Sequence, residues 1–543
     1  MSDSLWMACY ITKPLMTCPT CISHFLSSSV HVQQREMDIK LLAAAAFLVG
    51  VIVVYWFSRG SGPRIPGPPA HPLVGHTFQV PTIKTWKYYE DLWHKHGPIV
   101  KLTLAGDDIL VLSDPADAQE LASLGRRSRI YSSRRPLIYA GKYQSNHMRF
   151  TLLPYGEVFK RQLGAFHTML EPRIVGTYEE LQYQSSLRLL ADLADTPDNF
   201  FRHVPRFPAS LIFLLTFGKH LDEEGSDLVE VQKVLADFVY DINPGAHLVD
   251  TFPKLDLLPD FLSPWRAEAR RKRDREMKLY GGLAMDVKAR MEKDPELECF
   301  TARLFEQQKQ LGISDEEIFY ITGTAFASGT GTSAATLLWF VMAMTHFPGP
   351  MHKAQEEIDT VFNSYTLPDF SRVKDLPYVF ALIQEVIRWA PVVPLSFPHY
   401  LDVDDEYKGY TIKKGTTVIS SLWNMHHNEE EFPNSYDFQP ERFMKKPGQE
   451  LPSLLGEDNY GFGFGRRECP GQHLAVKSVW IAVVRMLWAY DIVPRKDANG
   501  VPMKCDEQDC TEGLTSRPNP FPATFVPRSA AHIETIQLAD RRA

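Results

Sequence analysis

The sequence predicts one large domain that is mainly α-helical and has a small β-sheet region. Apolar residues with helical spacing fill the middle and the late parts of the chain, whereas the alternation typical of strands is confined to short segments. Beyond the first 70 residues or so no stretch has the composition of a domain linker, and no internal repeat is visible. With 543 residues, 44% hydrophobic and 23% charged, the chain has ample material for a core.

Charge and cysteine content argue against two other kinds of protein. The net charge is -8 and the pI is about 6.2, so there is no global basic surface and no nucleic-acid partner is expected. Seven cysteines, an odd and scattered set, do not form a disulfide framework. Cys18 and Cys21 form a C-x-x-C pair, but no second pair of ligands follows at the spacing of a zinc site.

The chain begins with two segments that lie outside the predicted domain. Residues 1–36 lack periodicity and are predicted to be a disordered extension, with Met37 as an alternative start. Residues 37–62 are predicted to be a transmembrane anchor, because the apolar run from Leu41 to Phe57 would span about 26 Å as a helix. A cleaved signal peptide is the alternative, but no A-x-A-like site follows. The flanking charges do not fix the orientation.

The predicted catalytic domain, residues 63–543, starts with a stiff proline-rich spacer. The segment "IVKLTLAGDDILVLS" predicts two short strands around a turn at Gly106–Asp108. The next segment, "DPADAQELASL", predicts a helix with Asp114 as N-cap and Pro115 at its first position.

The segment "YGFGFGRRECPGQHLA" surrounds one cysteine with residues that suit a buried thiolate beside a large planar ligand. Gly463, Gly465 and Gly471 give the backbone freedom to approach closely. A helix that starts just after Pro470 would direct its positive end toward the Cys469 sulfur. A structural cysteine in a glycine turn is the alternative.

Within that segment, "FGFGRRECPG" resembles the haem-binding signature F-x-x-G-x-R-x-C-x-G of the cytochrome P-450 family. The matching residues are Phe462, Gly465, Arg467, Cys469 and Gly471. The resemblance implies that Cys469 is the axial ligand of the iron of haem b (heme b), and that the other four residues contribute to cofactor binding. The guanidinium of Arg467 suits a haem propionate.

A second match concerns the core of the family fold. "LIQEVIRWAPVVPL" places Glu385 and Arg388 at i and i+3 on one helix face, and "PERF" follows with Arg442. This order resembles the family's E-x-x-R and P-E-R-F elements. The resemblance implies that these three charges form a buried network that stabilises the structure around the haem. Burying any one of them without its partners would destabilise the fold by several kcal/mol.

A third match is partial. "ITGTAFASGTGTSAATLLWF" predicts a long helix interrupted by small residues, and Ser328 to Ser333 is similar to the family's oxygen-binding kink. The hydroxyl position is Thr332, but the acidic position before it is Gly331. Because the family relays protons through an acid–alcohol pair, we expect water ordered by Thr330 and Thr332 to take over that role.

The fourth match departs further from the family pattern. In "LPYGEVFKRQL" the family's W-x-x-x-R positions are occupied by Phe159 and Leu163, so propionate binding must rest on other residues. The position of His399 often serves this role, although a plain core histidine is an equal alternative. Arg149 is a further candidate.

The resemblance covers about residues 63 to 530. It is strongest to fungal membrane-bound members, such as O-methylsterigmatocystin oxidoreductase-like and tryptamine hydroxylase-like enzymes. It implies the cytochrome P-450 fold, an endoplasmic-reticulum membrane anchor with a cytosolic catalytic domain, and electrons from an NADPH-cytochrome reductase. The predicted activity is a haem-thiolate monooxygenase of fungal secondary metabolism. Alternatives are an isomerase or dehydratase that needs no O2, and a non-catalytic haem sensor.

The same resemblance proposes residues that face the substrate, and their apolar character predicts a lipophilic small molecule. They are Phe326, Ala327, Val392, Leu395, Ser396, Phe397, Leu514 and Thr515. Each is equally compatible with plain core packing.

Overall fold

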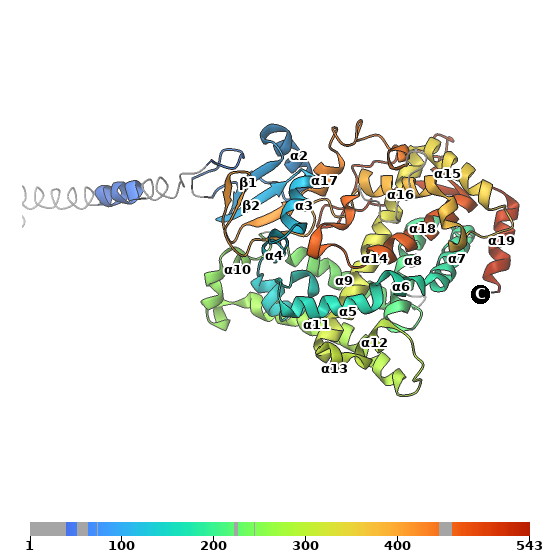
Figure 1. Cartoon of the computed structure of the whole chain (residues 1–543), viewed down its shortest axis with the longest axis horizontal. Coiled ribbons are helices and arrows are strands. Elements are labelled where there is room, and N and C mark those ends of the chain that lie inside the picture. Colours follow the sequence, from blue (N-terminus) through green and yellow to red (C-terminus); the bar gives the residue numbers. More distant parts are fainter. Residues whose placement is uncertain are drawn as a thin grey trace, which may run out of the picture. The chain divides into compact units, whose positions relative to one another are not determined.

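The structure is a computed structural model that describes residues 40–50, 63–72, 74–221, 226–243, 245–444 and 459–542 (Figure 1). The chain divides into two units, Met1–Pro63 and Arg64–Ala543. The predicted extension, residues 1–36, and much of the predicted anchor lie outside the described residues. Residues 40–50 of the anchor form a helix with exposed apolar side chains. Within the described ranges, no helix is both long and apolar enough to cross a membrane.

The second unit is built mainly from α-helices, so the predicted fold class is confirmed. Its α-helices are α2 (Thr85–His96), α3 (Pro115–Ser123), α4 (Arg127–Ile130), α5 (Glu157–Leu170), α6 (Pro172–Gly176), α7 (Glu179–Asp195), α8 (Phe200–Phe217), α9 (Ser226–Asp241), α10 (Leu248–Thr251), α11 (Pro264–Met291), α12 (Phe300–Glu306), α13 (Gln308–Leu311), α14 (Asp315–His346), α15 (Pro348–Val361), α16 (Pro377–Trp389), α17 (Leu422–His426), α18 (Gln472–Ala489) and α19 (Ala530–Asp540). Shorter helical turns are η1 (Ile138–Gln144), η2 (Phe150–Leu152), η3 (Pro197–Asn199), η4 (Pro253–Leu257), η5 (Asp260–Leu262), η6 (Phe370–Asp375), η7 (Pro440–Phe443), η8 (Tyr460–Phe462) and η9 (Gly465–Arg467).

The strands form one four-stranded sheet and two hairpins. Their bounds are β1 (Ile99–Leu104), β2 (Asp107–Leu112), β3 (His399–Tyr400), β4 (Asp405–Tyr407), β5 (Tyr410–Ile412), β6 (Thr417–Ser420), β7 (Tyr490–Pro494) and β8 (Ala523–Pro527). The larger sheet has the order β1-β2-β6-β3, in which β2 and β6 are parallel and the other pairs antiparallel. It therefore joins the start of the domain to the segment that follows α16.

The predicted hairpin and its following helix are both present. The turn between β1 and β2 consists of Ala105 and Gly106, which have φ values of 50° and 93°, so Asp108 already belongs to β2. The side chain of Asp114 accepts a hydrogen bond from the Ala116 amide and caps α3, with Pro115 at the first position as predicted.

Two long apolar helices, α14 and α18, form the centre of the core. Helix α14 begins with a capping box between Ser314 and Glu317 and contacts α8, α11, α16 and α18 (Figure 1). Helix α18 is almost entirely buried, as its run of apolar residues on all sides requires. These two helices fix the positions of the two walls of the candidate site.

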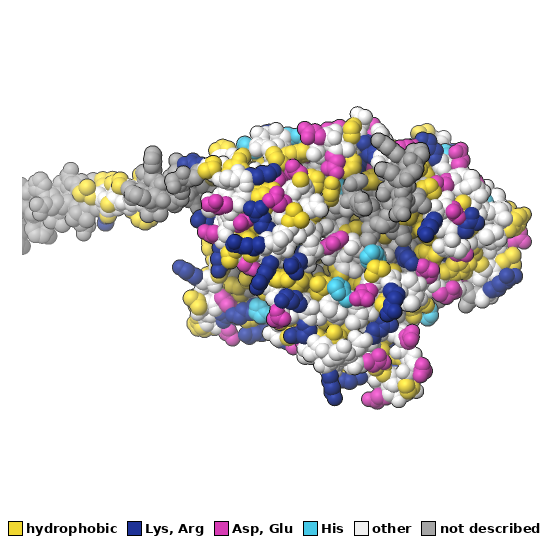
Figure 2. Space-filling model, in the orientation of Figure 1, with side chains coloured by type: hydrophobic (Ala, Val, Ile, Leu, Met, Phe, Trp, Pro, Cys, Tyr) yellow, Lys and Arg dark blue, Asp and Glu magenta, His cyan; other side chains and the backbone are white. Residues whose placement is uncertain are grey.

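On the face drawn in Figure 2, Lys and Arg side chains are interspersed with Asp and Glu. The described part of this face therefore carries charges of both signs.

Candidate active site

The cysteine loop is a tight turn that leads directly into α18. It consists of η8, η9 and the residues up to Gln472, where the helix begins, as predicted, just after Pro470. The Cys469 amide donates a hydrogen bond of 2.9 Å to the carbonyl of Phe462, which closes the loop beneath the sulfur. The sequence of this loop therefore fixes where the sulfur lies relative to the helix.

Of the three loop glycines singled out in the sequence, two are required by the backbone and the third is not. Gly463 and Gly465 have φ values of 80° and 63°, which other residues rarely adopt. A Cβ at Gly465 would lie 2.1 Å from the carbonyl oxygen of Ala122. Gly471 has an ordinary φ of -90°, so its backbone does not require glycine, but a Cβ there would lie 3.9 Å from the Cys469 sulfur, beside the space expected for the ligand.

The sulfur of Cys469 lies in the wall of a cavity of about 370 Å3. Burial raises the pKa of this thiol to about 11, and the amide of Gly471 offsets only part of that increase. A bound metal cation deprotonates a coordinating thiol outright. The site therefore fits a metal-centred group in which the cation stabilises the thiolate.

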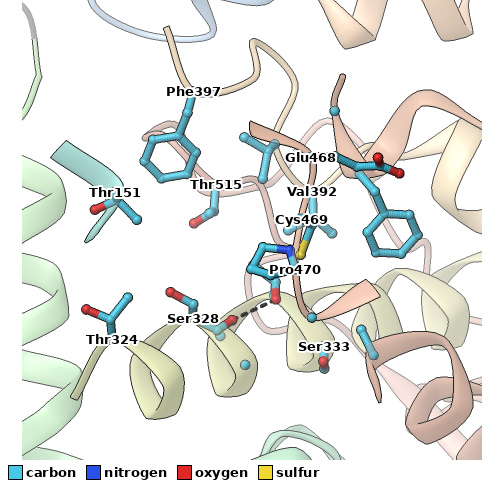
Figure 3. Close-up of a pocket in the computed structure, with 18 of the residues that line it drawn as sticks. Thr151, Thr324, Ser328, Ser333, Val392, Phe397, Glu468, Cys469, Pro470 and Thr515 are labelled. Atoms are coloured by element: carbon cyan, nitrogen blue, oxygen red, sulfur yellow. Dashed lines mark hydrogen bonds between the residues drawn. The ribbon is translucent and has the colours of Figure 1, made fainter. Parts of the chain in front are cut away.

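The cavity lies between the cysteine loop and α14 (Figure 3). Figure 3 shows Cys469 and Pro470 facing the stretch of α14 that carries Ser328 and Ser333, with Phe397 and Thr515 at its border. Most of the remaining wall is apolar. Apolar lining residues include Phe150, Phe166, Leu235, Phe238, Val392 and Leu514.

Three basic side chains, Arg134, Arg467 and His399, meet at one part of the cavity wall. Burial and mutual repulsion lower the pKa of Arg467 to about 8 and that of His399 to about 3, and burial lowers the pKa of Arg134 to about 9. Neither guanidinium forms an ion pair with any carboxylate among the described residues. Desolvated cations of this kind require an anion, and the propionates of haem would provide it.

The hydrogen bonds of these groups go to backbone carbonyls and fix their positions. Arg467 donates to the carbonyls of Ser132 and Leu153, both at 2.6 Å. Arg134 donates to the carbonyls of Phe397 and Pro398 at 3.0 and 2.8 Å.

His399 lies on β3, and its Nδ1 is 2.8 Å from the carbonyl of Tyr131. The sequence predicted Arg467 and His399 but missed Arg134, because nothing in its local sequence marks it as close to the cysteine loop.

The two residues at the W-x-x-x-R positions, Phe159 and Leu163, both lie at the cavity. The ring of Phe159 lies 3.7 Å from the Arg467 guanidinium and supports it by a cation–π contact. Leu163 lines the cavity. Arg149 also lines the cavity, but it pairs with Glu276 at 2.6 Å, so it already has an anionic partner.

Helix α14 is continuous through the predicted kink. Thr332 lines the cavity, and its hydroxyl donates a hydrogen bond of 2.8 Å to the carbonyl of Ser328. Thr330 is buried and does not line the cavity, so its position gives no support to the role expected for it. Gly331 lines the cavity and presents no side chain there.

The substrate-facing candidates divide in a similar way. Ala327, Val392, Ser396, Phe397, Leu514 and Thr515 line the cavity. Phe326 instead packs against Phe213 and Phe217, and Leu395 packs in the core. These two residues therefore belong to the plain packing that the sequence left open as an alternative.

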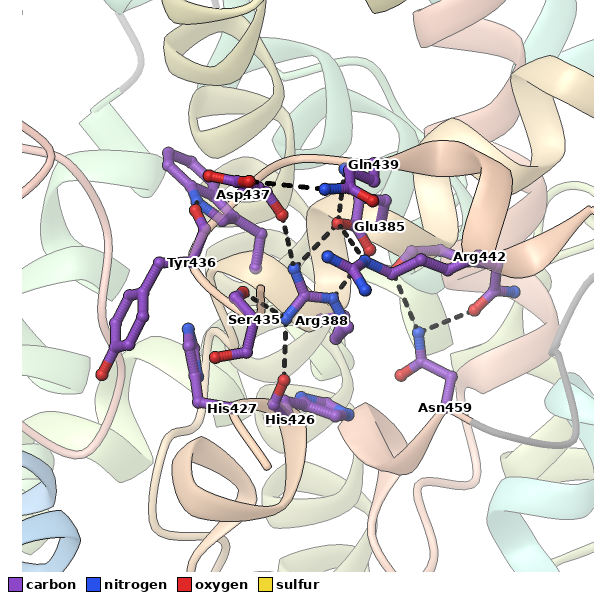
Figure 4. Close-up of polar contacts among 12 residues, drawn as sticks. Glu385, Arg388, His426, His427, Ser435, Tyr436, Asp437, Gln439, Arg442 and Asn459 are labelled. Carbon is purple, nitrogen blue, oxygen red and sulfur yellow. Dashed lines mark hydrogen bonds and ion pairs between the residues drawn. The ribbon is translucent and has the colours of Figure 1, made fainter. Parts of the chain in front are cut away.

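The three charges of the predicted network lie together (Figure 4). Arg388 donates to both carboxylate oxygens of Glu385, at 2.7 and 2.8 Å, and both side chains are fully buried. Arg388 also donates to three backbone carbonyls, those of His426, Ser435 and Asp437. The Nε of Arg442 is 3.5 Å from Glu385, a looser contact.

Comparison with known proteins places this site in a family. The family model described as "Cytochrome P450" matches residues 65–524. Cytochrome P450 monooxygenase aneD of Aspergillus aculeatus is 34% identical over 508 residues, which cover 92% of this chain and 95% of that protein.

Two further fungal relatives give the same picture. Cytochrome P450 monooxygenase 253 of Postia placenta is 32% identical, with 90% of this chain and 93% of that protein covered. Cytochrome P450 monooxygenase fogE of Aspergillus ruber is 32% identical, with 90% and 92% covered. The cytochrome P450 family binds haem b through a cysteine thiolate, which agrees with the cavity and its cysteine. The chain belongs to the cytochrome P450 family and is an oxidoreductase of the monooxygenase class.

Proposed function

We propose that this chain inserts oxygen into a lipophilic small molecule of fungal secondary metabolism, with Cys469 as the axial ligand of haem b and an NADPH-cytochrome reductase as electron donor. The observation that carries the proposal is the position of the Cys469 sulfur, in the wall of a largely apolar cavity that Thr332 also lines. When bound, a thiolate-ligated haem supplies the activation of O2 and the cleavage of its O–O bond.

The residues of the chain hold the cofactor and deliver protons. In this proposal Arg134, Arg467 and neutral His399 would bind the propionates, and Cys469 would hold the iron. Phe462, Gly465 and Gly471 shape the loop around that sulfur. Thr332 presents a hydroxyl to the cavity, where it can position a water molecule for proton transfer. Gly331 cannot donate a proton, so that water must receive its proton from solvent.

The apolar wall supports a lipophilic substrate, because a pocket lined by aromatic and aliphatic side chains gains most from burying apolar surface. The network of Glu385, Arg388 and Arg442 supports the cofactor indirectly. It joins α16 to the segment before the cysteine loop, and we propose that it keeps the loop in register with the rest of the core.

We further propose that residues 37–62 anchor the protein in the endoplasmic-reticulum membrane with the catalytic domain in the cytosol. The exposed apolar side chains of the helix at residues 40–50, which include Leu41, Phe47 and Leu48, support this assignment. A helix whose large side chains are apolar and exposed gains from contact with lipid.

The experiment that tests the oxidation is reconstitution of the full chain with an NADPH-cytochrome reductase in fungal-type microsomes, fed with an extract of candidate metabolites. Product that requires both NADPH and O2, and that carries 18O when 18O2 is supplied, supports the monooxygenase. Product formed without O2 would instead support an isomerase or dehydratase. The absence of an acid at position 331 is the observation that favours this second candidate.

A further inference from the structure

One part of the cavity wall carries polar groups that neither the cofactor nor the proton delivery uses. These are Arg149, Thr151 and Thr324. Arg149 and Thr151 belong to the segment around η2, which contacts α14, and Thr324 lies one turn before Ser328 on α14. Figure 3 shows Thr151 and Thr324 at one side of the cavity, with Ser328 and Thr515 between them and Cys469.

Each of these three residues has a polar atom without a hydrogen-bond partner in the described part of the protein. The hydroxyls of Thr151 and Thr324 and the Nε of Arg149 are buried, and none of them hydrogen-bonds to another described residue. Elsewhere on α14, the hydroxyls of Thr322, Thr332 and Thr336 donate to the carbonyl four residues earlier, whereas that of Thr330, which does not line the cavity, is also unpaired within the described ranges. Because buried polar atoms are nearly always paired in folded proteins, an unpaired set on a cavity wall indicates a partner that arrives with the ligand.

The charge of Arg149 is already neutralised. Its guanidinium is 2.6 Å from Glu276, and the two side chains are 3% and 2% exposed. Glu276 also accepts hydrogen bonds from Gln144 and Tyr320, each at 3.0 Å. A second carboxylate brought into this dry region would be repelled by Glu276 and would lose its hydration, whereas a neutral acceptor oxygen would meet neither cost.

We infer that the substrate presents a neutral carbonyl-type oxygen to Arg149, Thr151 and Thr324 while its apolar part extends toward Cys469. This inference rests on the proposed function, and it narrows the substrate class from any lipophilic molecule to a lipophilic ketone, quinone, lactone or amide. The carbonyl end fixes which carbon reaches the oxidising centre, because the other walls are mainly apolar and do not orient the molecule.

The test compares three naphthalenes of nearly equal shape on the haem-loaded full chain by isothermal titration calorimetry. 2-Acetylnaphthalene carries the carbonyl, 2-isopropenylnaphthalene replaces its oxygen by a CH2 group, and 2-naphthoate carries a carboxylate. We expect the ketone to bind about 5- to 20-fold more tightly than the hydrocarbon, which corresponds to one or two hydrogen bonds, and the carboxylate to bind more weakly than the ketone.

Thr324→Val and Thr151→Val remove one hydroxyl each at constant shape. Since these hydroxyls are unpaired within the protein, neither change removes a protein hydrogen bond that the fold needs. We expect each variant to bind the ketone several-fold more weakly and to bind the hydrocarbon with unchanged affinity. The double variant should have no preference for the ketone over the hydrocarbon. The matched control is Thr322→Val, which lies on α14 outside the cavity wall and should preserve the preference.

Equal affinity of ketone and hydrocarbon in the unchanged protein would overturn the inference, as would an unchanged preference in the double variant. If 2-naphthoate binds most tightly of the three, the inference is also wrong, because this part of the wall then binds a carboxylate and not a neutral oxygen. The spectrum of the reduced carbon monoxide complex, recorded on the same samples, reports on the thiolate ligand separately. A failure of the proposed function is therefore distinguishable from a failure of this inference.

Discussion

Replacing Arg388 by methionine should prevent the protein from accumulating in its folded, haem-loaded form. Arg388 is fully buried and donates hydrogen bonds to both oxygens of Glu385 and to the carbonyls of His426, Ser435 and Asp437. After the substitution, the carboxylate of Glu385 keeps only the Gln439 amide at 2.7 Å and the more distant Arg442 at 3.5 Å. A charge and three carbonyls are thus left buried without their main partner.

The size of the effect follows from these contacts. Removing one partner of a buried ion pair costs about 3–5 kcal/mol, and each unpaired buried polar group adds about 1–3 kcal/mol. The sum approaches or exceeds a typical stability of about 5–15 kcal/mol for a whole domain. Arg442→Met, by contrast, removes the 3.5 Å contact with Glu385 and a hydrogen bond of 2.9 Å to the Asn434 carbonyl, and should cost less, about 1–2 kcal/mol.

The assay is urea unfolding followed by circular dichroism, together with the fraction of protein that carries the thiolate carbon monoxide band. Arg388→Lys keeps the charge but cannot replace the hydrogen bonds of the forked guanidinium. Its free energy of unfolding should therefore lie between those of the unchanged protein and Arg388→Met. Glu385→Leu combined with Arg388→Met removes both charges and should be less harmful than Arg388→Met alone. The reasoning is refuted if Arg388→Met unfolds within about 1 kcal/mol of the unchanged protein, or if Arg442→Met is equally damaging.

Three further outcomes are expected. Thr332→Ala should lower turnover about 10- to 100-fold and raise the hydrogen peroxide formed per NADPH consumed. Gly331→Asp should raise the product formed per NADPH, since a Cβ there meets nothing closer than Leu235 at 3.6 Å. With Thr322→Ala as control, an unchanged ratio of product to NADPH in Thr332→Ala would exclude Thr332 from proton delivery. A chain that starts at Arg64 should move largely to the soluble fraction and still bind haem; complete retention in membranes would shift the attachment to residues 248–262, where Leu248, Leu257 and Phe261 are exposed. Burial and the neighbouring Arg388 lower the pKa of His426 to about 3 from an ordinary 6.5, so below about pH 6.5 only the unfolded chain binds a proton there and stability is lost as the pH falls. In His426→Gln the unfolding free energy should depend less steeply on pH, by up to about 1.4 kcal/mol per pH unit. An unchanged slope would contradict the lowered pKa.

Features set by a few neighbouring residues could be predicted from the sequence. The β1–β2 hairpin, the Asp114 cap and the helix after Pro470 each follow from local turn and capping preferences. The cysteine loop could be recognised because the residues that shape it lie within ten positions of one another. Even there, the sequence shows that a glycine is present but not the φ that it adopts, so it does not distinguish Gly463 and Gly465, which have positive φ, from Gly471, which does not.

Features that depend on contacts between distant segments could not be predicted. Arg134 lies near the cysteine loop only because the segment after α4 lies beside β3, and no local sequence pattern predicts that contact. A motif does not show which face of a helix a residue occupies, so the sequence predicts one role for Thr330 and Thr332 although only Thr332 lines the cavity. The unpaired hydroxyls of Thr151 and Thr324 are likewise visible only when every neighbour is placed.

The most direct test of the central claim is the absorption spectrum of the reduced protein under carbon monoxide, recorded for the unchanged chain, Cys469→His and Cys299→Ala. Cys299 is also buried and free, but it lies outside the cavity wall and serves as the matched control. If Cys469 ligates the iron, the unchanged protein and Cys299→Ala show the red-shifted Soret band of a thiolate complex, and Cys469→His loses it. Retention of that band in Cys469→His would contradict the account.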